Sequence, residues 1–499
     1  MSQIAVIGAG MGGMCAAARL AKAGHKVDVY EYSETYGGKC RTERIGNTAF
    51  DIGPSLLTLP AVYRDFFLKT GDPLDSVVQL EPVNPSFDYR FSDGSSVQFS
   101  NLSRYDTLNA IRTSFGVQAA SDWSRLMARA GSMWDVSRKP FVESELKSIA
   151  SLALTPSILK DITTIAPWKS LQSIVTQMTR DTRLQYIAQR YATYSGSDPR
   201  HAPAVLLSIA YIEEAFGAWH VAGGTGKLAQ AVYERAVETG VNFNFNSRVV
   251  RINHDGKKVV GITLLDNSSV LADIVVANAD ASQVYNQLIP EKLRSLRRPR
   301  VALKKATPSV AGFSIMIGTT RQPGLPSLAH HTILFPSDYD EEFNSIFSTK
   351  SPVKDPAIYI CAPGDPLMNQ DPDIEGWTIL VNAPRHSQDS DGWDWTDEQF
   401  ANEYANSIFD KVEARGIPIR DRIAFYEIRT PADLQSSVLA PGGSIYGTSS
   451  NGARAAFSRA RNRSPLAGLF CVGGSAHPGG GLPLVAISAE IVSNIVGRA

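Results

Sequence analysis

The order of apolar and polar positions at the start of the chain predicts a strand, a helix and a second strand. Residues 3–7 form a short apolar run, Met14 to Ala23 is rich in alanine and leucine, and apolar and polar residues alternate from Lys26 to Tyr30. Strand-like runs on either side of a helical stretch are typical of a β-α-β unit. We therefore expect the chain to open with such a unit.

The rest of the chain alternates between helical and strand-like patterns. From about residue 106 to 218 the apolar spacing is largely helical, with breaks expected at Pro140, Pro156, Pro167, Pro199 and Pro203. A glycine turn at 223–226 opens an expected helix from Lys227 to about Thr239, and a last helix is expected from about Leu484 to Val496. The expected strands are 242–253, 259–265, 273–277, 310–317, 357–362, 378–383 and 469–472.

The first glycine turn has the form of a dinucleotide-binding fingerprint. Gly8, Gly10 and Gly13 follow the pattern G-x-G-x-x-G, with Gly12 beside them, directly between the first expected strand and helix. Such glycines permit a tight turn, a close approach of a pyrophosphate, and close packing of helix on strand. The N–H groups at the start of the helix are then free to bind phosphates.

Glu31 extends this fingerprint. It ends the second expected strand, near the position about 20 residues further on where an acidic side chain binds a ribose hydroxyl. A carboxylate there repels a 2′-phosphate. The pattern therefore favours the adenosine of FAD or NAD over that of NADP.

Composition narrows the class of protein. The 499 residues carry 49 basic and 49 acidic side chains, so no excess of positive charge points to nucleic acid, and no nucleic-acid partner is expected. With 43% hydrophobic residues, a largely disordered chain is excluded. The length predicts two or three domains.

The cysteines and the ends of the chain point to a reduced protein inside the cell. The four cysteines are scattered and form no C-x-x-C pair, so neither a zinc site nor a disulfide framework is expected. The uncharged N-terminal segment lacks the basic region of a secretion signal. Residues 464–489 are uncharged too, but their glycines and prolines speak against a transmembrane helix.

A second glycine pair with a cation separates FAD from NAD. Gly37-Gly38-Lys39-Cys40-Arg41 follows shortly after Glu31 and suits a long dinucleotide lying across the domain. Together with the first turn, Glu31 and Asp51-Ile52-Gly53-Pro54-Ser55, these residues resemble the flavin-containing amine oxidase and phytoene desaturase superfamily. The resemblance implies a Rossmann-type FAD-binding domain and a second, α+β substrate domain.

Further segments resemble carotenoid desaturases of the bacterial phytoene desaturase type. These segments are spread along the chain. They are the stretch that begins with 191–199 and continues to Glu213, Trp219 together with 223–226, Thr430-Pro431-Ala432-Asp433-Leu434, Gly443-Ser444-Ile445-Tyr446-Gly447, and 473–483. Amine oxidases usually place Gly-Asp where this chain has Gly474-Ser475. The missing carboxylate matches the desaturase branch.

The resemblance also implies which residues bind FAD. Lys39 is expected at the pyrophosphate and the Gly53-Pro54 turn beside the isoalloxazine ring. The backbone of Val249 is expected at the adenine, although by pattern alone Val249 is simply a strand residue. Pro483 suits the first turn of a helix whose positive end stabilises reduced flavin. The full expected set is Gly8, Gly10, Gly12, Gly13, Glu31, Gly38, Lys39, Arg41, Gly53, Pro54, Ser55, Val249, Gly474, Ser475, Pro483 and Leu484.

Desaturation of a polyene needs an acceptor for two electrons and a group that takes a proton. Flavin supplies the first, so no nucleophile–base pair at a recognisable spacing is required. The expected proton-transfer candidates are Glu213, with Glu214 beside it, and His477. For each of them a solvated, capping or structural role is the alternative.

The substrate and the location follow indirectly. Apolar residues between Leu146 and Trp168 have mixed helical spacing, which suits a cap resting in the membrane interface and admitting a lipophilic polyene. Packing into the core is the alternative. We expect a cytoplasmic protein peripherally associated with the membrane surface, with oxygen or a quinone as electron acceptor.

The sequence thus predicts an FAD-dependent carotenoid desaturase acting on an acyclic carotenoid, hydroxylated or not. A related polyene isomerase or oxygenase, an amine oxidase-like flavoenzyme and an idle flavin-binding subunit remain alternatives. The FAD-binding domain is expected to be assembled from 1–75, 220–285 and 455–499. The substrate domain is expected to comprise 76–219 and 286–454, with a helical cap.

Overall fold

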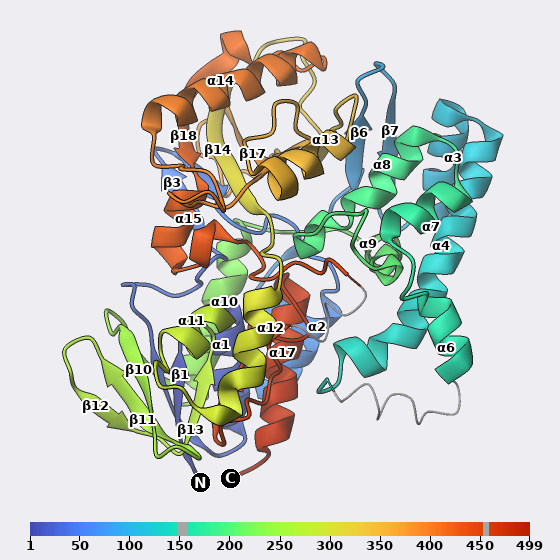
Figure 1. Ribbon diagram of the computed structural model, residues 1–499. Helices are drawn as coiled ribbons and strands as arrows, with labels where there is room; N and C mark the ends of the chain where they lie inside the picture. The colour runs from blue at the N-terminus through green and yellow to red at the C-terminus, as the bar shows by residue number, and fades with distance from the viewer. Residues whose placement is uncertain (147–157, 453–458) are drawn as a thin grey trace.

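A computed structural model describes residues 1–146, 158–452 and 459–499 (Figure 1). The lower part in this view contains a parallel sheet and both chain ends, the upper part a large mixed sheet, and a helical unit lies to one side. Part of the apolar segment expected to form a membrane cap, including Ile149 and Leu152, lies outside the described residues.

The lower part is built on a five-stranded sheet in which every neighbouring pair is parallel. Its strands come from three distant parts of the chain. In spatial order they are β19 (Leu469–Cys471), β13 (Ile274–Ala277), β1 (Gln3–Ile7), β2 (Lys26–Tyr30) and β9 (Asn242–Asn244). The expected β-α-β unit at the start of the chain is confirmed by β1, helix α1 (Met11–Lys22) and β2, although α1 begins three residues earlier than Met14.

Alternate residues of β1 are buried in two different cores. Ile4 and Val6 pack with α1, α10 (Thr225–Glu238), α17 (Leu482–Val496) and α2 (Ala61–Thr70). Ala5 and Ile7 pack on the other face, with α11 (Ala281–Asn286) and a three-stranded sheet formed by β10 (Val249–His254), β11 (Val259–Leu264) and β12 (Ser269–Leu271). The central strand is therefore apolar and buried on both faces from Ile4 to Ile7, as parallel strands covered on both sides are.

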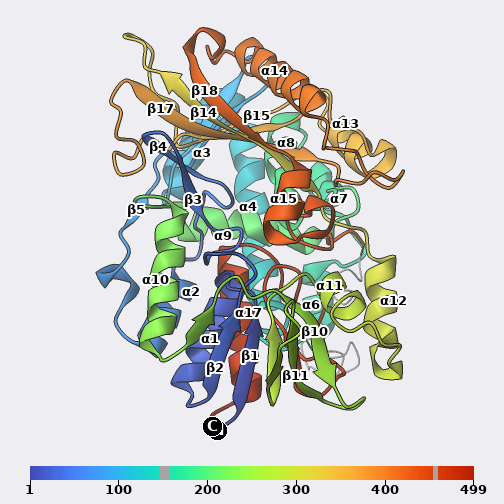
Figure 2. The same cartoon turned by 90° about the vertical axis from the view of Figure 1, so that its left-hand side faces the viewer.

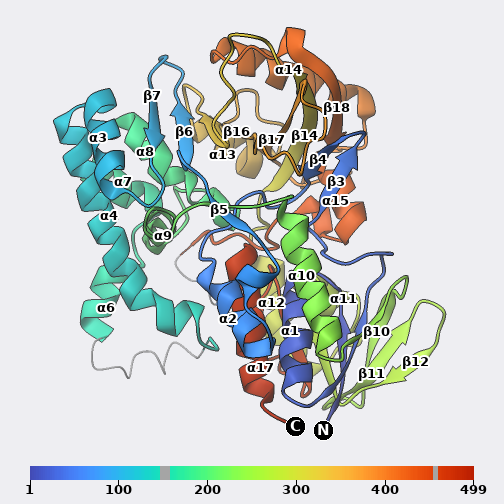
Figure 3. The ribbon, with the colours of Figure 1, turned by 180° about the vertical axis from the view of Figure 1, so that it is seen from behind.

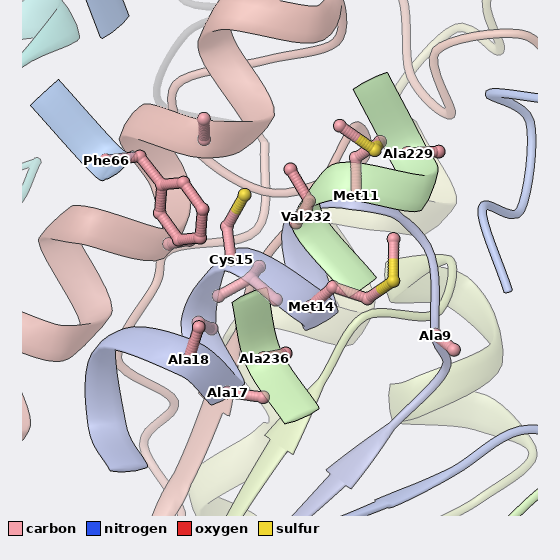
Figure 4. Close-up of a cluster of buried hydrophobic side chains, with 14 of the residues drawn as sticks. Ala9, Met11, Met14, Cys15, Ala17, Ala18, Phe66, Ala229, Val232 and Ala236 are labelled. Atoms are coloured by element: carbon pink, nitrogen blue, oxygen red, sulfur yellow. The ribbon is translucent and has the colours of Figure 1, made fainter. Parts of the chain in front are cut away.

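Small side chains let the helices of the first core lie close together. Figure 4 shows Ala17 and Ala18 of α1 beside Val232 and Ala236 of α10, with Phe66 of α2 closing the other side. These side chains are almost fully withdrawn from solvent. The start of α1, which carries the glycine turn, is thereby held in place from several directions.

The upper part is a seven-stranded mixed sheet. Its order is β18 (Ile423–Arg429), β14 (Ala311–Thr320), β17 (Ile374–Ala383), β16 (Ile358–Cys361), β15 (His331–Leu334), β6 (Phe87–Arg90) and β7 (Ser96–Phe99). Neighbours are antiparallel except β15 and β6, which run parallel. Helix α14 (Glu398–Ala414) covers one face (Figure 2).

The helical unit confirms the helical pattern expected between about 106 and 218, within the described residues. It packs against β6 and β7 on the side seen in Figure 3. Its helices are α3 (Arg104–Phe115), α4 (Val117–Ser137), α6 (Ile158–Ile165), α7 (Leu171–Met178), α8 (Thr182–Arg190) and α9 (Ser208–Phe216). No helix in the described part of the chain is both long and apolar enough to cross a membrane.

Shorter elements connect these parts. A hairpin of β3 (Thr42–Ile45) and β4 (Thr48–Asp51) rises toward β17, and β5 (Leu80–Pro82) pairs with β8 (Trp219–Val221). The remaining helices are α12 (Arg297–Lys305), α13 (Asp340–Phe343) and α15 (Pro431–Val438). Helix α12 lies beside α11 in the lower part of the molecule. The exact domain boundaries at 75, 219, 285 and 454 stay a prediction.

One expected strand is wrong. The stretch 242–253 forms two strands in different sheets, β9 in the parallel sheet and β10 in the three-stranded one. Asn246 between them has φ +54, a conformation that asparagine tolerates better than most residues. The N–H groups of Asn246 and Ser247 donate to the carbonyls of Ser33 and Glu31, so the break itself is hydrogen-bonded.

Gly13 offers a direct test of the packing between β1 and α1. A Cβ at this position would overlap the Gly8 carbonyl oxygen, which is backbone and cannot rotate away. We expect Gly13→Ala to lower the free energy of unfolding by about 1–3 kcal/mol or more and to reduce cofactor retention, measured by chemical denaturation and bound-cofactor absorbance.

Gly46→Ala is the matched control. It too introduces a methyl group, but Gly46 has no atom within 4 Å of the added Cβ and adopts φ +59, so only left-handed backbone strain is added. Equal stability and equal cofactor content in the two variants would contradict the packing argument.

Candidate functional site

The first glycine turn lies between β1 and α1 and contacts the second glycine pair. Gly8 has φ +94, which only glycine adopts without strain. The Gly37 N–H donates to the Ala9 carbonyl at 2.9 Å, and a Cβ at Gly38 would lie 3.2 Å from the Gly10 Cα. The first glycine turn and the second glycine pair are thus in direct backbone contact through Gly10 and Gly38.

Asn278, at the end of β13, lies against the first glycine turn. A Cβ at Gly10 would lie 2.8 Å from its Nδ2, and a Cβ at Gly12 would lie 2.8 Å from its Oδ1. A Cβ at Gly473, in the turn after β19, would collide with the same amide. One polar side chain therefore occupies the space between two glycine segments, and a larger residue at Gly10, Gly12 or Gly473 would leave no room for it.

Glu31 lies where a ribose-binding acid is expected, beside the first turn. Its Oε2 accepts the Ala9 N–H at 2.7 Å, and its Oε1 accepts the Ser33 N–H at 2.9 Å. The residue is only 7% exposed. The carboxylate is thus held against the glycine turn by two backbone donors, which suits binding of a hydroxyl beside it.

Two cations lie beyond the second glycine pair, the half-buried Lys39 and the buried Arg459. Lys39 Nζ donates to the carbonyls of Ser444 and Ile445 at 3.0 and 2.7 Å, and burial lowers the pKa of Lys39 to about 8. Arg459 donates to the carbonyls of Tyr446, Thr448 and Gly474, and burial lowers its pKa to about 10.

These cations share little negative charge. The nearby Asp280 carboxylate raises the pKa of Lys39 and of Arg459, but less than burial lowers them. The hydrogen bonds described above for the two side chains all go to neutral carbonyl oxygens. Such a pair of desolvated cations beside a glycine turn is suited to an anionic ligand. Arg459 was missed by the sequence reasoning, because it belongs to no glycine motif and is brought in only by tertiary packing.

The turn containing Gly53, Pro54 and Ser55 is anchored from two sides. A Cβ at Gly53 would overlap the Lys39 carbonyl oxygen, and the Pro54 carbonyl accepts the Thr225 hydroxyl at 2.8 Å. Asp51, just before this turn, accepts the Thr225 N–H at 2.9 Å. The turn is therefore tied both to the second glycine pair and to the start of α10.

The C-terminal turn brings Gly474 and Ser475 to the same region. The Gly474 carbonyl accepts from Arg459, and Ser475 Oγ accepts the Ala281 N–H at 2.9 Å. Pro483 lies in the first turn of α17, as expected, and Leu484 follows it, partly buried. Ser475 thus binds the start of α11, a neutral interaction in place of the carboxylate common in amine oxidases.

Two expected residues lie at the margin. Val249 begins β10 and is buried in the core shared with Tyr30 and Ala277. Arg41 forms an ion pair with Glu43 at 3.4 Å, while its buried Nε has no hydrogen-bond partner among the described residues. The structure therefore gives Val249 a clear packing role and leaves one donor of Arg41 available.

Glu213, in α9, is the centre of a buried polar network. Its carboxylate accepts the hydroxyls of Tyr191 at 2.5 Å and Tyr194 at 2.9 Å, and lies 3.6 Å from Arg190. Desolvation raises the pKa of Glu213, against the lowering effect of the arginine and the two hydroxyls. Its neighbour Glu214 instead accepts the Trp123 indole N–H.

Aromatic rings connect this network to the Gly53–Ser55 turn. The Arg190 guanidinium lies 4.6 Å from the centre of the Phe87 ring, and the His331 ring stacks on the same phenyl ring at 5.1 Å. His331 Nδ1 hydrogen-bonds the Tyr359 hydroxyl at 2.8 Å, and that hydroxyl hydrogen-bonds Ser55 Oγ at 2.7 Å. Motif residues about 160 positions apart, Ser55 and Glu213, are thus joined through β6, β15 and β16.

His477 lies apart from that network. Its Nε2 donates to the Ser144 carbonyl at 2.9 Å, and its own carbonyl accepts from Asn462 and Ser488. Burial lowers the pKa of His477 to about 4, so the ring is neutral near pH 7. With Nε2 donating, Nδ1 keeps its lone pair.

Comparison with known proteins adds to this geometry. A family model described as flavin containing amine oxidoreductase matches residues 11–353. The chain is 30% identical over 510 aligned residues to a 1-hydroxycarotenoid 3,4-desaturase of Flavobacterium sp. strain P99-3, covering 99% of each protein. It is 29% identical to a 4,4′-diapolycopene oxygenase of Methylomonas sp., covering 98% of this chain and 97% of that one.

A solved structure extends the comparison to the fold. Wild-type putrescine oxidase bound to putrescine matches 99% of this chain and 98% of its own with a TM-score of 0.65, at 15% identity. At that identity the likeness concerns the fold alone. The expected α/β fold, a dinucleotide-binding part joined to a substrate part, is confirmed at this level.

The Glu213 network predicts a large effect on stability. Glu213→Ala leaves the Arg190 guanidinium buried without a carboxylate, which costs about 3–5 kcal/mol. We expect a corresponding drop in the free energy of unfolding, measured by urea denaturation. Glu238→Ala, which removes the exposed partner of a buried arginine, Arg235, is the control and is expected to cost about 1 kcal/mol or less. Equal losses in the two variants would show that the Glu213 carboxylate does not compensate the Arg190 charge.

Proposed function

Because the chain belongs to the flavin-containing amine oxidoreductase family and has FAD as its cofactor, we propose that it is a carotenoid desaturase that introduces conjugated double bonds into an acyclic carotenoid. The observation that carries this proposal is similarity along the entire chain to a protein named 1-hydroxycarotenoid 3,4-desaturase. That name makes a hydroxylated carotenoid our first choice of substrate.

The residues around the glycine turns fit FAD. We propose that the backbone at Gly8, Gly10, Gly12, Gly13 and Gly38 faces the pyrophosphate and that Glu31 binds the ribose. The close backbone contact between Gly10 and Gly38 and the carboxylate held by two N–H groups support this. The cations Lys39 and Arg41 are proposed as pyrophosphate ligands, and we add Arg459 on the ground of its burial and its carbonyl partners.

The other end of the cofactor is assigned in the same way. Gly53, Pro54 and Ser55 are proposed beside the flavin ring, facing Gly474 and Ser475. The first turn of α17, with Pro483 and Leu484, supplies the positive end of a 15-residue helix. Val249 is proposed at the adenine. The FAD-binding domain, from 1–75, 220–285 and 455–499, and the substrate domain, from 76–219 and 286–454, are proposed with these limits.

Bound FAD supplies an acceptor for a hydride from an activated allylic C–H bond. The chain's own residues bind and orient the polyene, exclude water and take up the proton. Glu213 is proposed as the proton acceptor, because its pKa is raised by desolvation and because Arg190 beside it is connected through Phe87, His331 and Tyr359 to Ser55. His477 is the second candidate through its free Nδ1.

We also propose that the enzyme is cytoplasmic and rests on a membrane surface, where its lipophilic substrate is dissolved. Exposed apolar side chains at the end of the helical unit support contact with lipid: Ile162 of α6 is 40% exposed and Trp168 is 63% exposed. An aromatic residue at such a position suits the interface between lipid and water. Oxygen or a quinone is proposed as the final electron acceptor.

An oxygenase is the second candidate, since a relative of nearly equal identity bears that name. The amine oxidase alternative is weaker, because Ser475 replaces the usual carboxylate and hydrogen-bonds the start of α11. Both alternatives are separated from desaturation by the products they form.

The proposed reaction is tested without oxygen. The FAD-loaded protein is mixed with liposomes carrying phytoene, neurosporene, lycopene or a 1-hydroxylated carotenoid, and flavin bleaching is followed together with product absorption. We expect one polyene to bleach the flavin and give a red-shifted product two hydrogens lighter. Bleaching by putrescine but by no polyene would establish an amine oxidase, and a product that gains oxygen in air would establish an oxygenase.

Lys39 predicts how cofactor affinity depends on pH. Because burial lowers its pKa to about 8, the free protein loses this charge above that pH, whereas an adjacent pyrophosphate raises the pKa again. FAD binding therefore takes up a proton above about pH 8, and affinity falls as pH rises, by up to about tenfold per unit.

The measurement is FAD titration by fluorescence quenching between about pH 7 and 9. Lys39→Arg keeps the charge at every pH and is expected to flatten the dependence, while Lys69→Met, a change at an exposed lysine of α2, leaves the wild-type slope. Identical slopes for wild type and Lys39→Arg would remove Lys39 from the pyrophosphate site.

A further inference from the structure

Two histidines and a cysteine converge at the edge of β15 and β16. These strands are antiparallel, and His331 lies directly opposite Cys361, so both side chains lie on one face of the sheet. His330 precedes the strand, and its ring centre lies 4.3 Å from that of His331. One ring nitrogen of each histidine and the Cys361 Sγ all lie within 4.8 Å of one another.

The two imidazoles have unused nitrogens. His331 is fully buried and Cys361 is 4% exposed. Nε2 of His330 and Nε2 of His331 are withdrawn from solvent and have no hydrogen-bond partner among the described residues. Buried polar atoms are rarely left unpaired, so each of these two atoms indicates a missing partner. The other ring nitrogen of His330, Nδ1, lies 3.8 Å from the Cys361 Sγ, so this histidine and the cysteine already contact each other.

Surrounding side chains hold the rings in place. Tyr359 occupies Nδ1 of His331, which leaves Nε2 as the free atom of that ring. His220 packs edge-on against His330 at 4.9 Å and is itself held by Asp365 at 2.8 Å. A histidine whose second nitrogen is fixed by a hydrogen bond is the usual arrangement around a bound metal ion.

We propose that His330, His331 and Cys361 bind one divalent transition-metal ion, zinc(II) in the first place. Imidazole nitrogen and thiolate sulfur are the ligands that zinc prefers, whereas magnesium and calcium require oxygen. Three protein ligands leave a fourth position for water or a substrate oxygen. Binding converts the Cys361 thiol to a thiolate, and its proton leaves to solvent.

The three ligand atoms must move slightly closer together to bind one zinc ion. In a tetrahedral zinc shell the N and S ligand atoms lie about 3.3–3.6 Å apart, somewhat closer than the 4.8 Å limit within which these three lie. Side-chain rotation can supply the difference. The sequence reasoning expected no zinc site because it searched for cysteine pairs, whereas these ligands are two adjacent histidines and one cysteine on the next strand of the sheet.

This site goes beyond the proposed desaturation and does not depend on it. It lies one side chain away from the Gly53–Ser55 turn, since Tyr359 hydrogen-bonds both His331 and Ser55. A metal ion there would add a Lewis acid in a region otherwise lined by aromatic rings.

The test uses the FAD-loaded, full-length protein. It is dialysed against a chelator, then titrated with Co²⁺, and the zinc content of untreated protein is measured by mass spectrometry of the elements. We expect one Co²⁺ per chain, with the visible bands of tetrahedral cobalt and a thiolate-to-cobalt charge-transfer band, both abolished by one equivalent of Zn²⁺.

Variants identify the ligands. Cys361→Ser is expected to remove the charge-transfer band and weaken binding by more than about 100-fold, and Tyr359→Phe to weaken it by about 10–100-fold. Cys471→Ser, which changes another buried cysteine, is expected to leave spectrum and affinity unchanged. If a variant fails to fold, the titration of the wild-type protein alone still tests whether a metal ion is bound. No stoichiometric Co²⁺ binding by the wild type, or a thiolate band that persists in Cys361→Ser, would overturn the proposal.

Discussion

The close approach of backbone segments at the first glycine turn is the constraint on which the rest of the structure depends. Gly8–Gly13 and Gly473 meet around the Asn278 side chain, Gly37–Gly38 packs against Gly10, and each segment comes from a different part of the chain. Such an approach is possible only because β1, β13 and β19 are parallel neighbours, whose carboxyl ends all lie at one edge of the sheet. Bringing these turns together at one edge requires the parallel sheet, the layers that cover its two faces, and the long segments that connect its strands.

The long segments between the strands of the parallel sheet supply the polar side chains around the proposed substrate site. Between β2 and β9 the chain forms the helical unit with Arg190 and Glu213, and between β13 and β19 it forms most of the mixed sheet with His331 and Tyr359. Burying a guanidinium among four aromatic rings with one carboxylate is costly unless the geometry is rigid. The packing of α8 and α9 against β6 supplies that rigidity.

Features that depend on nearby residues could be predicted from the sequence, whereas features that depend on tertiary contacts could not. Local features are readable: the glycine turn, the acid at the end of β2 and the apolar periods of β1, β13 and α17 all depend on neighbours a few residues away. The split of 242–253 into β9 and β10 was not readable, because both halves have the same strand pattern and only their partners differ. Arg459 and the His330–His331–Cys361 cluster were missed for a related reason, since tertiary packing alone makes these groups buried or adjacent.

The order of strands in the parallel sheet also determines when the sheet can be completed during synthesis. A ribosome delivers β1 and β2 first, β9 and β13 much later, and β19 only after the strands of the mixed sheet that follow β13. Until then the outer edge of β13 has no partner, and an open, apolar strand edge invites pairing with other chains. The cofactor-binding half therefore cannot complete its fold until β19 has been made, so its maturation waits for the entire segment between β13 and β19.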